Sequence, residues 1–276
     1  MRIVADTATL FSPAEGKEMG MTIIPVGVLV DGKAYQDLVE IDRDTFVEMI
    51  QAGGVPTSSQ PSLGDVLEVM EESDEEMLML TVADGLSGGY QAAVAAKNAM
   101  EKNAHIHIMD SQTLAAPLRY LAKKALTLRE QGLNMETIKA ELQKRIETSM
   151  SFVIPEDFEF LKRSGRLTSL TAKIGGTLKL LPVLTQTRDR KRIMPMTVKR
   201  SWKSAVAAII QRMQDAGVDE KYLVSVCHAN TRERAQEVMA QIREKLQNVE
   251  TEILRLSPAL MTHGGPGCIV VQAILK

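Results

Sequence analysis

A chain of 276 residues with 45% hydrophobic and 25% charged residues is typical of a folded globular protein with one large or two modest domains. The net charge of −2 argues against general nucleic-acid binding, and no apolar run approaches the roughly 18 to 20 residues that span a bilayer. The N-terminus shows no secretory signal, and Cys227 and Cys268 lack zinc-ligand spacing. We therefore expect a cytoplasmic protein with no stable membrane insertion and no disulfide framework.

The first half of the chain alternates short apolar runs with helical patterns. Predicted buried strands, each followed by a polar loop and a helix, are Arg2–Ala5, Met77–Val82 and Ile106–Met109. Further predicted features are helices at 42–51, 62–70, 113–132 and 135–147, with Ser62 and Asn134 as N-caps, and a hairpin turn at Asp31-Gly32. This alternation predicts an α/β fold whose mostly parallel sheet is covered on both faces, with ligands at the carboxyl ends of the strands.

The alternation of predicted strands and helices gives way to a different order near residue 150, which predicts domains at residues 1–150 and 151–276. An antiparallel pair, Lys179–Gln186 and Ile193–Val198, is expected to flank the basic turn Arg188–Arg192. The other predicted elements are helices Ser204–Ala216 and Thr231–Lys245 and strands Tyr222–Cys227, Glu250–Leu256 and Cys268–Leu275.

Two hydroxyl-bearing loops in the first half of the chain suggest an anion site. The loop 56–62 places Thr57, Ser58, Ser59 and Ser62 between and beside two prolines, just before a helix. Free amides and hydroxyls at a helix N-terminus suit a carboxylate or phosphate, although plain turn and cap chemistry explains the same residues. The loop 83–90 offers Ser87 among glycines near another helix start, but it lacks Walker spacing and a nucleophile elbow.

A third loop, His263-Gly264-Gly265-Pro266-Gly267, leads into the last strand. Its glycines and proline fix a backbone path and leave the ring room to reach a ligand, so His263 is the best ligand-binding candidate of the four histidines. The neutral ring could hydrogen-bond a hydroxyl or carboxylate, and the charged ring could pair with an anion. Asp6-Thr7 and Asp110-Ser111 follow strands and are expected to cap helices. The chain shows no carboxylate pair at acid/base spacing, no metal motif and no dinucleotide fingerprint.

The segment from Lys162 to Lys203 is strongly basic, with twelve Lys or Arg residues and a single acid, Asp189. Such a segment fits an anionic protein surface, head group or phosphate, or simply a solvated face.

Taken in order, six motifs resemble those of the DegV family: Asp6-Thr7-Ala8, Thr57-Ser58-Ser59-Gln60-Pro61-Ser62, Leu86-Ser87-Gly88-Gly89-Tyr90-Gln91, Asp110-Ser111, Ser164-Gly165-Arg166-Leu167 and His263-Gly264-Gly265-Pro266-Gly267. Members of that family bind fatty acids and act as the acyl-carrying subunit of bacterial fatty acid kinase. The resemblance implies a three-layer α/β/α parallel-sheet domain, a mixed-sheet α/β domain, and an apolar tunnel between them for the acyl chain.

The resemblance also implies roles for individual residues. Ser58 and Ser87 match the positions that contact the fatty-acid carboxylate, Thr57 and Ser59 flank Ser58, and His263 joins the network. Arg166 and Arg200 match arginines implicated in head-group or kinase contact. The implied ligand is a long-chain fatty acid, the implied partner is the kinase catalytic subunit, and no cofactor is expected.

Four positions depart from the family pattern. Thr7 stands where the family usually has Ser, and Ser58 stands where it more often has Thr, so both positions keep a hydroxyl. Gly89 replaces Thr, so this position loses its hydroxyl. Ser164 stands where Gly often precedes Gly-Arg.

Two rival functions are weighed against fatty-acid binding. Ser87 and His263 could form the nucleophile and base of an acyl-ester hydrolase, but no acid is plainly placed to orient the histidine. The basic segment could serve a DNA-associated regulator, but no helix-turn-helix or other reader is apparent.

Overall fold

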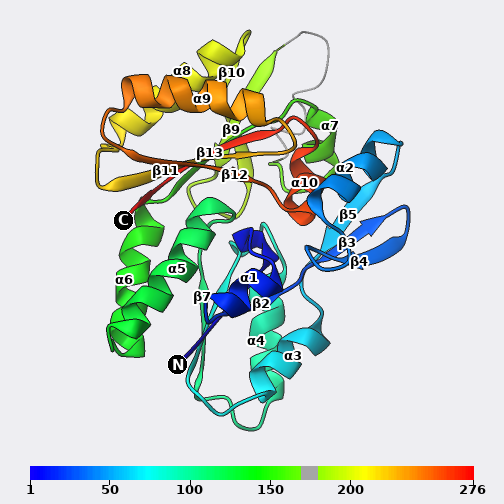
Figure 1. The fold of residues 1–276 in the computed structure, drawn as a ribbon, viewed down its shortest axis with the longest axis vertical. Helices are drawn as coiled ribbons and strands as arrows, with labels where there is room; N and C mark the ends of the chain where they lie inside the picture. Colours follow the sequence, from blue (N-terminus) through cyan, green and yellow to red (C-terminus); the bar gives the residue numbers. More distant parts are fainter. Residues whose placement is uncertain (169–179) are drawn as a thin grey trace. The chain divides into compact units, whose positions relative to one another are not determined.

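The computed structural model describes residues 1–168 and 180–276 and divides the chain into two compact units (Figure 1). Unit 1 comprises Met1–Ile146 with Ser257–Leu260, and unit 2 comprises Glu147–Leu256 with Met261–Lys276. Unit 1 therefore includes the short segment 257–260, which comes late in the sequence and interrupts unit 2.

Unit 1 is built on a parallel sheet of four strands in the order β2-β1-β6-β7. The strands are β1 (Arg2–Asp6), β2 (Thr22–Ile24), β6 (Met77–Thr81) and β7 (Ile106–Asp110). The three predicted strands are therefore confirmed. All five residues of β6 are buried, as expected for a central strand covered on both faces.

Helices cover both faces of this sheet. They are α1 (Pro13–Glu18), α3 (Leu63–Glu71), α4 (Gly89–Ala99), α5 (Ala116–Glu130) and α6 (Met135–Thr148). Apolar residues of α3 and α4 form one core cluster with the sheet, which includes Val66, Ala93 and Met77. On the other side of the sheet α5 packs against β1 and β6, next to α6 (Figure 1). The α/β fold class with a parallel sheet is confirmed.

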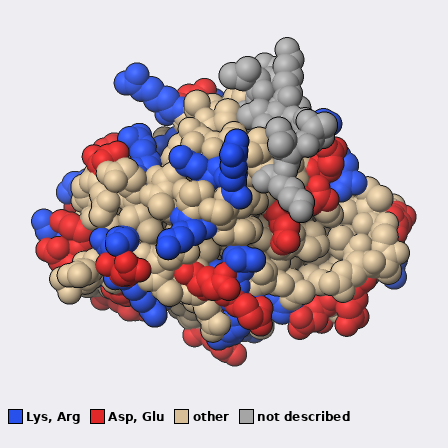
Figure 2. Space-filling model, turned by 90° about the horizontal axis from the view of Figure 1, so that it is seen from above, with Lys and Arg blue, Asp and Glu red and all other residues tan. Residues whose placement is uncertain are grey.

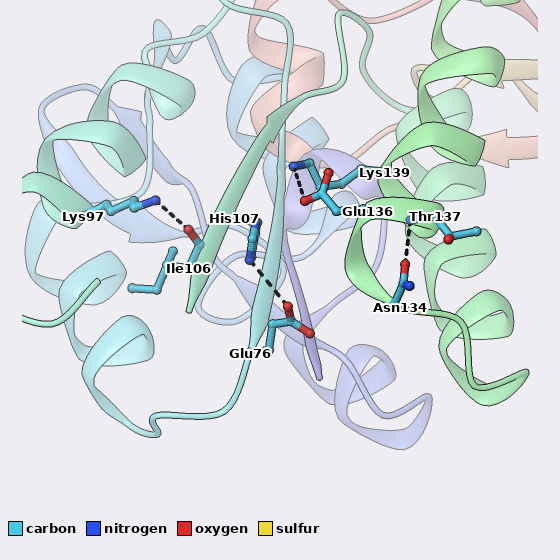
Figure 3. Close-up of polar contacts among 8 residues, drawn as sticks. All are labelled: Glu76, Lys97, Ile106, His107, Asn134, Glu136, Thr137 and Lys139. Atoms are coloured by element: carbon cyan, nitrogen blue, oxygen red, sulfur yellow. Dashed lines mark hydrogen bonds and ion pairs between the residues drawn. The ribbon is translucent and has the colours of Figure 1, made fainter. Parts of the chain in front are cut away.

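Side-chain caps fix where several helices begin. Ser62 Oγ accepts a hydrogen bond from Asp65 N at 3.0 Å, and Asn134 Oδ1 accepts from Thr137 N at 2.9 Å (Figure 3). Both predicted caps are confirmed. Figure 3 also shows Lys97 Nζ donating to the carbonyl of Ile106 at 2.7 Å, which ties α4 to β7.

A second, antiparallel sheet of unit 1 has the order β4-β3-β5. Its strands are β3 (Gly27–Val30), β4 (Lys33–Gln36) and β5 (Pro56–Ser59). The predicted hairpin at Asp31-Gly32 joins β3 to β4. The first four residues of the hydroxyl loop form β5 instead of a loop, because Ser and Thr side chains also suit an edge strand and Pro56 is tolerated as its first residue. Helix α2 (Arg43–Gln51), capped by Asp42, precedes β5.

Unit 2 contains a mixed sheet of six strands in the order β10-β9-β8-β13-β11-β12, in which only β11 and β12 run parallel. The strands are β8 (Met150–Ile154), β9 (Leu181–Gln186), β10 (Ile193–Lys199), β11 (Tyr222–His228), β12 (Glu250–Arg255) and β13 (Ile269–Leu275). The predicted antiparallel pair around the basic turn is confirmed, although its proposed first residue, Lys179, lies outside the described residues.

Helices α8 (Trp202–Asp215) and α9 (Arg232–Lys245) bury their apolar stripes against this mixed sheet. Their Ile209 and Val238 share a core cluster with Phe152 of β8 and Val271 of β13. The described residues also form the helices η1 (Thr7–Thr9), α7 (Phe158–Arg163) and α10 (Pro258–Gly264).

Close packing of α1 on β2 gives a test of the fold. A Cβ built on Gly16 would approach buried Ile23 closer than real Cβ atoms do, with the carbonyl oxygen of Met21 at 3.3 Å. Gly16→Ala should therefore destabilise the protein by about 1 to 3 kcal/mol in urea unfolding. Gly64→Ala is the matched control, because its nearest neighbour lies at 3.7 Å; it should stabilise α3 by about 0.5 to 1 kcal/mol. Equal effects of the two substitutions would contradict the packing.

Candidate functional site

The carboxyl edge of the parallel sheet carries the polar loops of unit 1. Asp6 closes β1 and caps η1, its Oδ1 accepting from Ala8 N at 2.8 Å. After β7, Asp110 Oδ1 accepts from Gln112 N at 2.8 Å and from Asp84 N at 3.2 Å, which links the loops that follow β6 and β7. Ligands bind parallel sheets at this edge.

Three residues of these loops have strained backbone conformations. Leu10, Gln112 and Ala115 all adopt positive φ angles, of 68°, 52° and 54°. Ala115 is fully buried and its amide donates to the carbonyl of Ala8 at 3.0 Å, so tertiary contacts hold it in this conformation. Strain of this kind costs on the order of 1 to 3 kcal/mol per residue and is found preferentially at functional sites.

The hydroxyl segment and the Ser87 loop are neighbours. The Ser59 side chain packs on Gly27 of β3, where an added Cβ would require the Ser59 hydroxyl to move. Next to it, the side-chain amide of Gln60 lies against Gly88, where an added Cβ would sit 3.0 Å from Gln60 Oε1. The structure thus brings together the two predicted segments of unit 1. Thr57 and Ser59 are exposed, and Ser58 and Ser87 are half-buried.

Ser87 is held at the start of α4. Its Oγ accepts from Gly89 N at 3.2 Å and its own amide donates to Ala83 O at 3.2 Å. Within the described part of the chain the Ser87 hydroxyl has no acceptor for its proton. A half-buried hydroxyl with a free donor at a helix N-terminus is suited to an anionic ligand.

In unit 2, His263 occupies the last turn of α10 rather than the loop in which we expected it. Burial lowers its pKa to about 3, assisted by the positive charge of Arg166. Of the two forms left open by the sequence, the neutral imidazole is therefore the relevant one at neutral pH. It can donate or accept a hydrogen bond but cannot supply a counter-charge.

The backbone beyond His263 requires glycine. Gly265 has a φ of 72° and faces the ring of Phe160, and Gly267 has a φ of 79° and faces the Glu156 carboxylate. At both positions an added Cβ would come closer to these side chains than real Cβ atoms do. The Gly267 amide donates to Ala229 O at 2.8 Å, which anchors this turn to the end of β11.

Arg166 and Arg200 differ in their surroundings. Arg166 is half-buried, desolvation lowers its pKa, and its charge acts on His263. Arg200 is exposed between β10 and the N-cap of α8. The other exposed members of the basic segment among the described residues are Lys162, Arg163, Arg188, Lys191, Arg192 and Lys203, while Lys173 and Lys179 lie outside the described residues. The face drawn in Figure 2 shows Lys and Arg interspersed with Asp and Glu rather than a uniformly basic surface.

The sequence reasoning missed a pair of buried carboxyl groups. Asp6 and Asp37, which lies between β4 and α2, are 3% and 0% exposed and interact electrostatically. Burial raises the pKa of Asp6 to about 7 and that of Asp37 to about 6. Because the two residues are far apart in the sequence and on different elements, no spacing rule could have paired them.

The described residues offer neither a metal-binding cluster nor a membrane-spanning helix. No group of three His, Cys, Asp or Glu side chains within residues 1–168 and 180–276 could hold a metal ion. In the same ranges, every helix is too short or too polar to cross a bilayer.

Comparison with known proteins gives the family. Residues 1–276 match the family model described as "Uncharacterised protein, DegV family". The chain belongs to the DegV family. It is 29% identical to protein DegV of Bacillus subtilis (strain 168) over 273 residues, which cover 96% of each protein.

Solved structures of DegV proteins share the fold. The crystal structure of DegV from Bacillus subtilis, described as a fatty acid binding protein, superposes with a TM-score of 0.86 at 26% identity, covering 100% of this chain and 99% of that one. A DegV family protein from Thermus thermophilus, whose structure is described in terms of fatty acid binding, gives a TM-score of 0.84 at 26% identity, with full coverage of both chains. The two-domain DegV architecture predicted from the resemblance is thereby confirmed.

The departures from the DegV pattern can be located in the structure. Thr7 Oγ1 accepts from Val26 N at 3.2 Å, so the hydroxyl of this position is used. Ser164 Oγ donates to Leu161 O at 2.6 Å and closes α7. At Gly89 an added Cβ would lie 3.5 Å from Ser87 Oγ and 3.8 Å from Asp6 Oδ2, so the hydroxyl that this chain lacks would stand between those two groups.

The low pKa of His263 gives a pH prediction. Its ring carbon resonances in NMR spectra should not titrate between about pH 5 and 8 in the folded protein, and should titrate near 6.5 in urea. Arg166→Gln should raise this pKa, because it removes the positive charge that disfavours the imidazolium. A folded-state midpoint between about 6 and 7 would contradict a buried, neutral His263.

Proposed function

We propose that this chain binds one long-chain fatty acid and holds its carboxylate with the hydroxyls of Ser58 and Ser87. The main support is the full-length match, at 26% identity, to two DegV proteins described as fatty acid binding. Thr57 and Ser59 flank Ser58, and His263 is the proposed neutral member of the hydrogen-bond network.

The chemistry of these groups favours a carboxylate ligand. A carboxylate withdrawn from water must be hydrogen-bonded, and the Ser87 hydroxyl and the N-terminus of the eleven-residue helix α4 both favour a negative charge. A neutral His263 adds a donor without a fixed counter-charge, so the bound group remains available for reaction. Arg166 supplies positive charge next to His263.

The acyl chain supplies the affinity. Each buried CH₂ contributes about 0.8 kcal/mol, so a chain of about sixteen carbons gains on the order of 10 kcal/mol before association and ordering costs. In this proposal the chain lies in an apolar tunnel while the carboxylate is presented to a partner.

We further propose that the partner is the catalytic subunit of a fatty acid kinase, which phosphorylates the bound carboxylate to an acyl phosphate. Arg166 and Arg200 are the proposed contacts for the phosphorylated head group and the kinase. Exposed Arg200 suits a partner surface, whereas half-buried Arg166 suits the head group. The carrier itself needs no catalytic residue in this scheme.

The hydrolase alternative gains no support. A general base for Ser87 would need a pKa near neutrality, and the pKa of His263 is about 3. No acid contributes to that value: burial and Arg166 both lower it.

Native mass spectrometry tests fatty-acid binding directly. The purified protein should carry an added mass of roughly 250 to 285 Da, released on denaturation as a fatty acid of about sixteen to eighteen carbons. Ser58→Ala and Ser87→Ala should each weaken oleate binding by about 5- to 100-fold, since each removes one bond to a charged group. Thr127→Ala is the control, because this exposed hydroxyl only donates to Lys123 O within α5. A protein that neither carries nor takes up a fatty acid would refute the proposal.

A reconstituted kinase assay tests the second part. With a kinase that accepts the wild-type carrier, Arg166→Ala and Arg200→Ala should each lower acyl-phosphate formation by about tenfold or more, because each removes a charge proposed to meet the phosphate or the kinase. Arg212→Ala, an exposed arginine of α8, should leave the rate unchanged. Unchanged rates in all three variants would remove Arg166 and Arg200 from the mechanism.

A further inference from the structure

The buried carboxyl groups of Asp6 and Asp37 have no role in the fatty-acid site as described so far. Asp6 Oδ1 accepts from Ala8 N at 2.8 Å, and Asp37 Oδ1 accepts from Ala259 N at 3.2 Å. Asp37 Oδ2 is buried and has no hydrogen-bond partner among the described residues. An ionised oxygen left without a donor in a protein interior is unfavourable, so this cluster is suited to carrying a proton.

Few charged groups act on this pair. Asp6 interacts with Asp37, and Asp37 also interacts with Arg43 of α2, which donates a hydrogen bond to Leu10 O at 3.0 Å. The hydroxyls of Thr7 and Ser257 approach Asp37 and favour its ionised form without reaching regular hydrogen-bond geometry. Burial outweighs all of these and raises the pKa of Asp6 to about 7 and of Asp37 to about 6.

Asp6 lies close to the proposed carboxylate site. A Cβ at Gly89 would be 3.8 Å from Asp6 Oδ2 and 3.5 Å from Ser87 Oγ, so these two oxygens are within about 7 Å of one another. A ligand carboxylate bonded to Ser87 would therefore place a negative charge roughly 10 Å or less from the Asp6 carboxyl group. At such a distance inside a protein, a second anion raises a carboxyl pKa by roughly one unit.

We propose that binding of a fatty-acid carboxylate at Ser87 is coupled to uptake of a proton from solvent by the buried Asp6–Asp37 pair. This inference rests on the proposed fatty-acid site. The proton adds to an aspartate oxygen, the ligand remains a carboxylate, and the repulsion between the two anions is removed. Binding is therefore strongest when the pair is protonated, and it weakens as the pH rises past neutrality.

Isothermal titration calorimetry measures this coupling. Oleate delivered from cyclodextrin is titrated near pH 7.5 into the whole protein, in three buffers that differ in ionisation enthalpy. The observed binding enthalpy is plotted against the ionisation enthalpy of the buffer, and the slope should correspond to an uptake of about 0.3 to 1 proton per oleate. Between about pH 6.5 and 8.5 the affinity should fall about 3- to 10-fold.

Substitutions identify the acceptor of the proton. Asp6→Asn resembles the protonated carboxyl group, so it should abolish or sharply reduce the uptake and keep the affinity at its low-pH value across the range. A variant damaged in its fold would instead lose affinity at every pH. Asp37→Asn should reduce the uptake as well, and Asp74→Asn, an exposed surface acid of unit 1, should change nothing.

A substitution that adds a hydroxyl next to Asp6 gives a second test. Gly89→Ser adds a hydroxyl near Asp6 Oδ2, at a position where an added Cβ makes only ordinary contacts, 3.5 Å from Ser87 Oγ and 3.8 Å from Asp6 Oδ2. By donating to the ionised carboxylate it should lower the midpoint of the affinity change by about half a pH unit or more.

The outcomes separate the two proposals. Failure of oleate to bind at any pH would sink the proposed function. Normal binding with no proton uptake, or an uptake that persists in both Asp6→Asn and Asp37→Asn, would overturn the coupling alone.

Discussion

Desolvation of ionisable groups is the constraint on which the candidate residues of each unit depend. Burial raises the pKa of Asp6 and Asp37, raises that of Cys268 to about 12, and lowers that of His263 to about 3. In each case the neutral form is favoured. In the proposed function the ligand carboxylate meets hydroxyls, amides and a neutral ring, and Arg166 is the charged group that acts on His263. Such a site can bind an anion without neutralising it.

Close backbone approaches position those groups in each unit. Ser59 lies against Gly27 and Gln60 against Gly88, which sets the hydroxyl segment beside the loop of Ser87. In unit 2 the chain turns after His263 through residues that face Phe160 and Glu156. A side chain at Gly265 or Gly267 would have to displace Phe160 or Glu156. At Gly88 and Gly27 an added Cβ would require only the side-chain ends of Gln60 and Ser59 to move. Packing against Gly27 and Gly88 thus helps to place the segment of Ser59 and Gln60 beside the Ser87 loop.

The parts of the fold predicted from the sequence are those encoded locally. The continuous apolar run of β6 and the caps at Ser62 and Asn134 are local signals, and the structure confirms them. Pro, Ser and Thr are common in turns, so the segment 56–59 by itself predicts a loop, whereas its pairing with β3 as a strand depends on residues distant in the sequence. The pairing of Asp6 with Asp37 is non-local for the same reason. The roles of Ser58, Ser87, His263, Arg166 and Arg200 came from the family resemblance and remain proposals.

The buried acids and the buried histidine act on stability with opposite signs. Because the pKa values of Asp6 and Asp37 are raised from 3.8, the folded state binds more protons than the unfolded state between about pH 4 and 7, and stability falls as pH rises through that range. His263, depressed from 6.5, has the reverse effect below pH 6.5, since there the unfolded chain binds the proton. The two contributions oppose each other in mild acid, whereas near pH 7 the folded state holds a neutral His263 that no longer titrates and an Asp6 that still does. Of these three groups, Asp6 is therefore the one whose protonation a bound anion can change most at neutral pH.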